Sequence, residues 1–276
     1  MQFPLQEIDG SREKIVCFES YGVRVGIKSE HVSFLKSFAS RLIEIFPTDL
    51  KNIENSEIQH FFTVFRSGEK VGFIKNDEEP SEPASESNVF KFLLSLIRLT
   101  VAEHAAAKVF VHAGVVVWKG KALVFPGNSF SGKTSLVREL ISHGAEYYSD
   151  EYAIFDKDGL VHPFPKTLSI RGIIDDFEQV EHSAEELGAR IGTMPRPVGL
   201  VHFTEFEKNA VWNPKPLSIG EGVLKIISFT IPIRVSPAFS LNVLNRSMNG
   251  ALISESKRGD ARQVSKEIIG FLDKNG

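Results

Sequence analysis

Apolar and polar residues alternate in four runs of the first part of the chain, and this alternation predicts β-strands. The four runs cover residues 14–19, 21–27, 58–65 and 71–75. Between the second and third runs, residues 31–46 carry apolar side chains at the three-and-four spacing of an amphipathic helix. Together these elements predict a small α+β unit over residues 1–75, in which no cluster of side chains indicates catalysis.

A polar segment separates this unit from the rest of the chain. Residues 76–87 read NDEEPSEPASES, which is acidic, rich in proline and serine, and without periodicity. Such a composition is typical of a linker or a mobile loop. We therefore expect residues 88–276 to form a second domain.

This second stretch mixes strand and helix patterns. Short apolar or alternating runs predict strands over residues 109–118, 121–125, 146–149, 152–155, 198–203 and 231–235. Helical spacing predicts helices over residues 88–107, 134–143 and 261–272. Hairpins combined with a strand-to-helix unit are typical of an α/β fold with a mixed β-sheet, and less so of a purely parallel sheet.

Composition narrows the class of protein. Of 276 residues, 42% are hydrophobic and 24% are charged, which is typical of a globular protein in water. The net charge of −3 argues against nucleic acid as the main partner. The single cysteine, Cys17, excludes an intramolecular disulfide and a cysteine-rich zinc site, which suits a reducing compartment. We expect a cytoplasmic protein.

No segment predicts contact with a membrane. The first residues, MQFPLQEIDGSREK, lack an apolar core of signal-peptide length. The most hydrophobic stretch, residues 89–107, is interrupted by Lys91, Arg98 and Glu103, which indicates a buried helix and not a membrane span.

The most informative motif is GNSFSGKT at residues 127–134, which matches the phosphate-binding pattern G-x-x-x-x-G-K-[ST]. Its residues are Gly127, Asn128, Ser129, Phe130, Ser131, Gly132, Lys133 and Thr134, and Ser135 follows them. Glycines let successive backbone N–H groups turn inward around phosphates, while Lys133 supplies a positive charge and the Thr134 hydroxyl can ligate Mg²⁺. The motif stands between a predicted strand and a predicted helix, as the mechanism requires. We expect ATP and Mg²⁺ as ligands.

Two carboxylates follow the next predicted strand. Asp150 and Glu151 would lie at the same edge of the sheet as the loop if their strand runs beside the loop strand. Asp150 could then accept a proton from a substrate hydroxyl, and Glu151 could help to hold the metal together with Asp150 and Thr134. Alternatively, both are solvated turn carboxylates.

Other polar residues near these segments carry weaker signals. His112 lies inside an apolar strand, where a hydrogen-bonded structural histidine is an alternative to a catalytic one. Lys166 is expected in a turn close in sequence to Arg171. Arg196 lies between two prolines in a stiff loop, and a solvated surface role explains it as well as contact with phosphate does.

Four segments in this order resemble the HPr kinase/phosphorylase family. They are HAGV at 112–115, the loop at 127–134, SDE at 149–151 and LSIRGII at 168–174. The resemblance covers roughly residues 108–176. It implies that Asp150 is the catalytic base, Glu151 its acidic neighbour near the metal, His112 the active-site histidine and Arg171 the signature arginine. It also implies a kinase core like that of phosphoenolpyruvate carboxykinase, with a mixed sheet.

The chain departs from the family pattern at three places. Ser169 stands where the family signature has glutamate, Ala113 separates His112 from its glycine, and residues 173–175 lack the second signature glycine. The family uses this downstream segment in the reverse, phosphorylase reaction. The chain resembles more closely the broad group of HPr-kinase-like proteins that phosphorylate other hydroxyls, and this resemblance implies an acceptor other than HPr.

The leading hypothesis is an ATP- and Mg²⁺-dependent kinase that transfers the γ-phosphoryl group to a hydroxyl, in a serine-containing peptide or a serine-like small molecule. The alternative is a nucleotide-binding regulatory protein that has lost phosphotransfer, which Ser169 favours. A carboxykinase-like metabolic enzyme ranks last, because no histidine and lysine for a second metal site are found. A homo-oligomer is compatible with the sequence.

Overall fold

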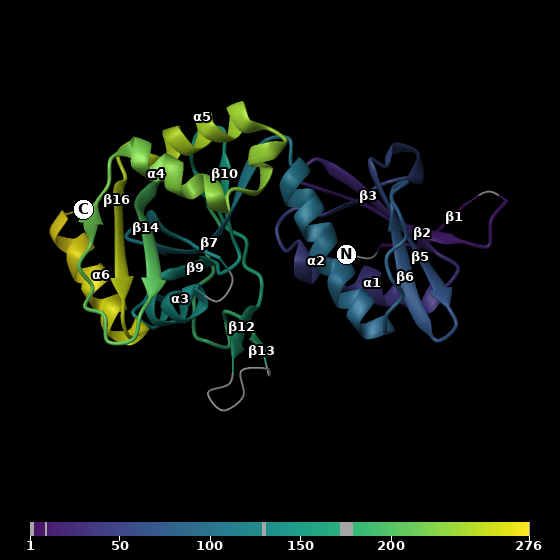
Figure 1. The fold of residues 1–276 in the computed structure, drawn as a ribbon, viewed down its shortest axis with the longest axis horizontal. Helices are drawn as coiled ribbons and strands as arrows, with labels where there is room; N and C mark the ends of the chain where they lie inside the picture. Colours follow the sequence, from purple (N-terminus) through teal and green to yellow (C-terminus); the bar gives the residue numbers. More distant parts are fainter. Residues whose placement is uncertain (1–2, 9, 129–130, 172–178, 276) are drawn as a thin grey trace. The chain divides into compact units, whose positions relative to one another are not determined.

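The chain folds into two units, Met1–Ala107 and Lys108–Gly276, each with its own sheet and core (Figure 1). The computed structural model describes residues 3–8, 10–128, 131–171 and 179–275. Among these residues, no helix combines the length and the apolar composition needed to cross a membrane.

The first unit is a mixed sheet covered by two helices. Its strands are β1 (Gln6–Glu7), β2 (Lys14–Ser20), β3 (Val23–Ser29), β4 (Lys51–Asn52), β5 (His60–Ser67) and β6 (Lys70–Lys75). The order is β1-β2-β3-β5-β6, with β4 beside β2. Helix α1 (Val32–Ile45) connects the parallel strands β3 and β5, and a short 3₁₀ turn, η1 (Asn55–Glu57), precedes β5. The four predicted strands and the predicted helix are confirmed to within two residues.

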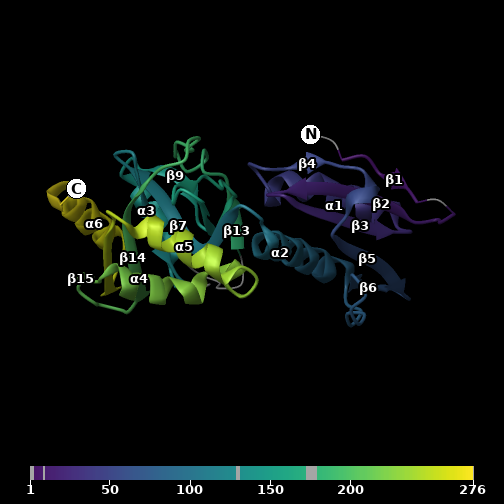
Figure 2. The same ribbon diagram turned by 90° about the horizontal axis from the view of Figure 1, so that it is seen from above.

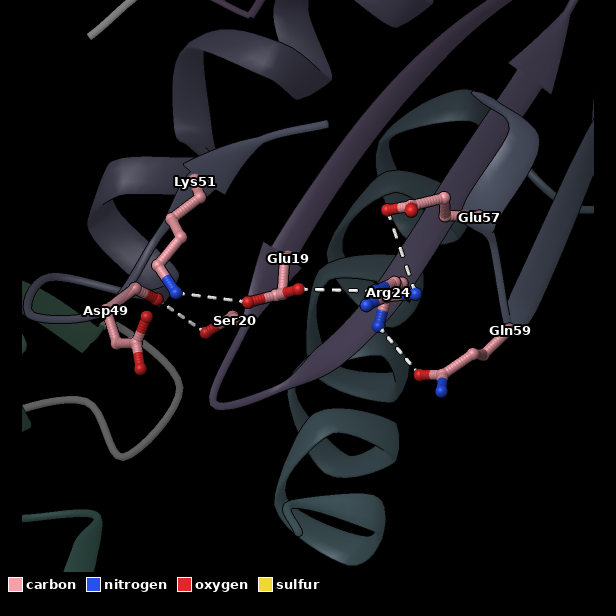
Figure 3. A network of polar contacts seen from close by, with 7 residues as sticks. All are labelled: Glu19, Ser20, Arg24, Asp49, Lys51, Glu57 and Gln59. Carbon is pink, nitrogen blue, oxygen red and sulfur yellow. Dashed lines mark hydrogen bonds and ion pairs between the residues drawn. The ribbon is translucent and has the colours of Figure 1, made fainter. Parts of the chain in front are cut away.

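The β2–β3 hairpin turns at Tyr21 and Gly22, where both residues have positive φ, 49° and 79°. This is the backbone of a tight two-residue turn, which explains why the strand begins at Val23 and not at Tyr21. Beside the turn, Glu19 accepts from Arg24 at 3.2 Å and from Lys51 at 3.1 Å (Figure 3). These cations lower the pKa of Glu19 and tie β2 to β3 and β4.

Helix α2 (Glu86–His104) belongs to the first unit, whereas the sequence pattern assigned it to the second. It begins at Ser85, whose hydroxyl accepts from the backbone N–H of Asn88. Phe90 packs edge-to-face on Phe34 and Phe38 of α1, with ring centroids 5.4 and 5.7 Å away. This burial of aromatic area holds the helix against its own unit.

The acidic segment before α2 is hydrogen-bonded to β6, so it is not an interdomain linker. Ala84 and Val71 exchange two backbone hydrogen bonds of 2.9 Å, and Ser81 donates to the carbonyl of Phe73 at 2.9 Å. Backbone pairing of this kind depends on no side-chain pattern, so the composition of the segment did not reveal it.

The second unit is built on an eight-stranded mixed sheet with the order β11-β10-β7-β8-β14-β16-β15, and with β9 also paired to β7. The strands are β7 (Lys108–Trp118), β8 (Lys121–Pro126), β9 (Glu146–Ser149), β10 (Tyr152–Asp156), β11 (Val161–His162), β14 (Val198–Phe206), β15 (Lys215–Pro216) and β16 (Leu252–Arg258). Strands β8, β14 and β16 run parallel, and the other pairs are antiparallel. The predicted mixed α/β sheet is confirmed. A separate two-stranded sheet pairs β12 (Leu168–Arg171) with β13 (Gln179–His182) in antiparallel orientation.

Helices cover both faces of this sheet (Figure 2). Helices α3 (Lys133–Ser142) and α6 (Ala261–Asn275) pack on one face, in a core that includes Phe125, Leu136 and Ile268. Helices α4 (Ile219–Ile226) and α5 (Pro237–Met248) pack on the opposite face. The result is a three-layer unit with the sheet in the middle.

The strand predicted over residues 231–235 is wrong. The segment forms a 3₁₀ helix, η3 (Ile231–Arg234), which follows a shorter one, η2 (Ile227–Phe229). Pro232 stands at the start of η3, where its missing N–H costs no hydrogen bond, whereas it would interrupt a strand ladder. The apolar composition of this segment is typical of a strand, but its backbone is not extended.

A buried histidine connects elements of the second unit through hydrogen bonds. His202 of β14 lies with Nδ1 2.9 Å from the Ser254 hydroxyl, and its Nε2 accepts from the Trp212 indole at 3.0 Å. The side chain is fully buried. Burial lowers the pKa of His202 to about 4, so the ring is neutral at physiological pH.

This network predicts a loss of stability on acidification. Because the pKa of His202 is about 4 when folded and near 6.5 when unfolded, its contribution is complete above pH 6.5 and decreases as the pH falls toward 4. In His202→Gln, the free energy of unfolding should depend less on pH across this window, by about 1 kcal/mol per pH unit. Urea unfolding at several pH values measures the difference, and equal pH dependence in both proteins would contradict it.

Candidate phosphate-binding site

The motif at residues 127–134 connects a strand to a helix, which confirms the predicted local order. Strand β8 ends at Pro126, and α3 begins at Lys133. Gly132 caps the helix with φ 83° and ψ 17°, a left-handed conformation that favours glycine. The first N–H groups of α3 and its positive end therefore face the loop. Two predicted site residues, Ser129 and Phe130, lie outside the described residues.

The Lys133 ammonium lies across the loop. It donates to the carbonyl oxygens of Gly127 at 2.9 Å and Asn128 at 2.6 Å. Burial lowers its pKa, while the charges of Asp150 and Glu151 act in the opposite direction. An ammonium held only by carbonyl oxygens beside the start of a helix can exchange those contacts for the oxygens of an anion.

Asp150 reaches the start of α3. Its Oδ2 accepts from the Thr134 hydroxyl at 3.2 Å, and its Oδ1 lies 3.2 Å from the Tyr147 hydroxyl. Burial raises the pKa of Asp150 to about 6, with a further upward contribution from Glu151 and opposing ones from Lys166, Thr134 and Tyr147. Asp150 is therefore no solvated turn carboxylate.

Strand β9, which Asp150 follows, is not the neighbour of β8, the strand that precedes the loop. Strand β7 lies between β8 and β9 and is antiparallel to both, so β8 and β9 point the same way. Their carboxyl ends consequently meet at one edge of the sheet, which is why Asp150 still contacts Thr134.

Glu151 is placed by its backbone and by Lys166. Its carbonyl accepts from Ala113 at 3.2 Å, and its carboxylate forms an ion pair of 3.4 Å with the Lys166 ammonium. Both side chains are largely buried. Lys166, which the sequence indicates only weakly as a site residue, therefore lies beside the predicted site.

His112 lies on the loop side of the sheet. Its carbonyl accepts from Gly127 at 3.2 Å, and its ring lies 5.1 Å from that of Tyr152. Side chains two positions apart share a face, and a Cβ on Gly114 would lie 3.5 Å from Cβ of Lys133. His112 therefore lies on the same face of the sheet as Lys133.

The family signature segment is described only in part. Leu168, the first residue of β12, is buried against α3, which places this segment beside the helix of the loop. Residues 172–178 lie outside the described residues, as do the side chains of Ser169 and Arg171. Arg196 exchanges backbone hydrogen bonds with Val161.

One residue at the loop had no signal in the sequence. Arg258, the last residue of β16, is 2% exposed and donates to the carbonyl of Gly132 at 2.8 Å. No motif contains it, and its strand was not predicted. Only recognition of β16 as a parallel neighbour of β14 could have placed it at this edge of the sheet.

The oxygen donors near the loop suit Mg²⁺. This ion is usually held by one or two carboxylates together with phosphate oxygens and water, and it needs no cage of protein ligands. The Thr134 hydroxyl and the Asp150 carboxylate are adjacent, and Glu151 follows in the chain. Among the described residues, no group of three or more His, Cys, Asp or Glu side chains could hold a metal on its own.

Comparison with known proteins identifies no family. No family model and no curated protein matches the sequence. Among solved structures, the HPr(Ser) kinase/phosphatase from Coxiella burnetii is similar at 13% identity and a TM-score of 0.34, over 60% of this chain and 99% of that one. The likeness is distant, and neither the fold family nor the activity is inferred from it.

The raised pKa of Asp150 predicts that its charge destabilises the fold. With a folded pKa of about 6 and an unfolded value near 3.8, the wild type loses stability as the pH rises through this window. Asp150→Asn should therefore be more stable than the wild type at pH 7.5, by about 1–3 kcal/mol, and equal to it near pH 3.8. Urea unfolding in magnesium-free buffer measures this, and a less stable variant at pH 7.5 would contradict it.

Proposed function

We propose that this chain binds a nucleoside triphosphate, with ATP as the expected one, and Mg²⁺ at residues 127–134, and transfers the γ-phosphoryl group to a hydroxyl. The observation that carries the proposal is the contact of Asp150 with Thr134. A phosphate loop alone occurs in motors, switches and transporters as well as kinases. A largely buried carboxylate on the loop threonine, with its pKa raised to about 6, adds the group that a phosphotransfer site needs to accept a proton.

In this proposal each residue has a defined task, and Asp150 has two. The backbone N–H groups of the loop hold the β-phosphate, and the Lys133 ammonium offsets the charge that moves toward the leaving oxygen. Asp150 accepts the proton of the acceptor hydroxyl. When bound, Mg²⁺ would neutralise phosphate charge and align the oxygens, with Thr134, Asp150 and Glu151 as its protein ligands.

The surrounding residues support this arrangement. Lys166 pairs with Glu151 and holds its carboxylate near the loop. His112 lies on the same face of the sheet as Lys133, where an imidazole can contact a phosphoryl oxygen or the acceptor. The resemblance in sequence to HPr kinase/phosphorylase supports the same roles and adds Arg171. The acceptor is expected in a serine-containing peptide or a serine-like small molecule.

The alternative is a regulatory protein that binds nucleotide without transferring phosphate. Ser169 favours this function, because it replaces the glutamate of the family signature. The two functions differ in one measurement, the appearance of labelled acceptor after incubation with γ-labelled ATP and a fractionated extract of the source cells. If labelled inorganic phosphate were the only product, the proposed kinase function would be contradicted.

Lys133→Ala should strongly weaken nucleotide binding, because it removes the cation that is proposed to face the β- and γ-phosphates. We expect the dissociation constant for MgATP, measured by calorimetry, to rise by about a hundredfold or more. Lys121→Ala, which removes an exposed lysine from β8, is the matched control and should bind as the wild type does. Unchanged binding by Lys133→Ala would show that the loop does not hold the nucleotide.

Asp150→Asn should separate binding from transfer. Because asparagine keeps the shape but cannot accept a proton, nucleotide should still bind while the transfer rate falls by about a hundredfold or more. Asp158→Asn, on an exposed turn of the same unit, is the matched control and should transfer normally. Full transfer by Asp150→Asn would eliminate it as the base.

A further inference from the structure

Arg258 lies at the phosphate loop because of the strand order. Strands β8, β14 and β16 are parallel, and Arg258 pairs with Phe206 at the end of the ladder. The carboxyl ends of parallel strands meet at one edge, so the end of β16 reaches the loop that follows β8. The residue is 2% exposed, so its charge is almost completely removed from water.

The guanidinium is held by carbonyl oxygens. One amino group, Nη2, donates to Gly132 at 2.8 Å and to Ser131 at 3.5 Å, and Nη1 donates to Gly259 at 3.0 Å. Among the described residues, no carboxylate forms an ion pair with it and its Nε has no hydrogen-bond partner, while its central carbon lies 5.6 Å from the centre of the Phe206 ring. Burial lowers the pKa of Arg258, and the charge of Asp260 opposes this.

Such an arrangement is costly for stability alone. A buried cation without an ion-pair partner loses its hydration, and in return this one gains carbonyl dipoles, the face of the Phe206 ring and the attraction of the Asp260 charge. It also lies near the positive end of α3, which disfavours a second positive group. A bound anion at the loop would compensate both effects.

The direction of the two carbonyls determines the direction of the loop amides. In a trans peptide the C=O and the N–H point to opposite sides, and the described residues contain no cis peptide. Because the carbonyls of Ser131 and Gly132 point toward Arg258, the N–H groups of Gly132 and Lys133 point away from it. The guanidinium charge also polarises these peptides and makes their N–H groups stronger donors.

We propose that Arg258 is a positioning residue, which holds the peptides 131–132 and 132–133 with their N–H groups aimed at the bound phosphate. This role rests on the proposed function, because it assumes that the loop binds phosphate. Arg258 contacts the back of the loop and acts through the backbone, so it touches no reacting atom.

Gly132 and Arg258 fit together sterically. A Cβ on Gly132 would lie 2.1 Å from Nη2, much closer than any real contact. Glycine is therefore required here both for its positive φ and for the approach of the guanidinium.

The test is to titrate inorganic pyrophosphate into this 276-residue chain, labelled with ¹⁵N at its glycines and lysines. In the wild type, the amide signals of Gly132 and Lys133 should shift on binding. In Arg258→Met, which removes the donors and keeps a similar apolar stem, the dissociation constant should rise by about tenfold or more. In this variant, the amide signals of Gly132 and Lys133 should shift differently from those of the wild type when pyrophosphate binds. If Arg258 had a purely structural role, the two signals would shift as they do in the wild type.

Two further variants control the interpretation. Arg262→Met removes an exposed arginine at the start of α6 and should bind as the wild type does. Arg258→Lys keeps the charge but loses the forked donors, so it should restore only part of the affinity. If Arg258→Met does not fold, Arg258→Lys decides, and wild-type affinity with wild-type amide shifts in it overturns the proposal.

The experiment separates this role from the proposed function. If the wild type binds pyrophosphate and Arg258→Met binds it equally with the same amide shifts, only the role of Arg258 is overturned. If the wild type binds neither pyrophosphate nor MgATP, the phosphate site itself is overturned, and the role of Arg258 with it.

Discussion

The hydrogen bond between Thr134 and Asp150 is the contact on which the candidate site depends. It joins the first turn of α3 to the end of β9, two elements that no strand ladder connects directly. The contact is possible because β7 runs antiparallel to both β8 and β9 and so turns their carboxyl ends to one edge. Without that strand order, the loop and the carboxylate would lie at opposite ends of the sheet.

Buried charge is the second property of this edge. Lys133, Asp150 and Arg258 are all shifted in pKa mainly by burial, and each shift disfavours the charged form. A charged side chain whose burial disfavours ionisation lowers the free energy of unfolding. Such side chains are typical of functional sites that use the charge. His202 in the same sheet differs, because its neutral ring is satisfied by hydrogen bonds and needs no ligand.

Much of the fold followed from hydrophobic pattern, and the exceptions have physical causes. Most strands and four helices were predicted because their apolar faces repeat at the correct period. The sequence pattern places helix α2 in the second unit, whereas it packs in the first, because an apolar helix face does not indicate which core it packs against. The composition of residues 76–87 predicts a linker or a mobile loop, because composition does not show the backbone hydrogen bonds that this segment makes to β6. Pro232 makes a 3₁₀ helix of an apolar run whose composition predicts a strand.

The sequence by itself determined the loop, its lysine and threonine, and the two carboxylates after the next strand. It could do so because neighbouring residues in the chain determine local backbone geometry and local charge. Only the tertiary structure decided that Asp150 contacts Thr134, that Lys166 pairs with Glu151, and that Arg258 lies behind Gly132. These pairs lie 15 to 126 residues apart in the chain, and the order of the strands, with the segments that connect them, brings the pairs together. Strand order depends on the packing of the whole sheet, which no local pattern encodes.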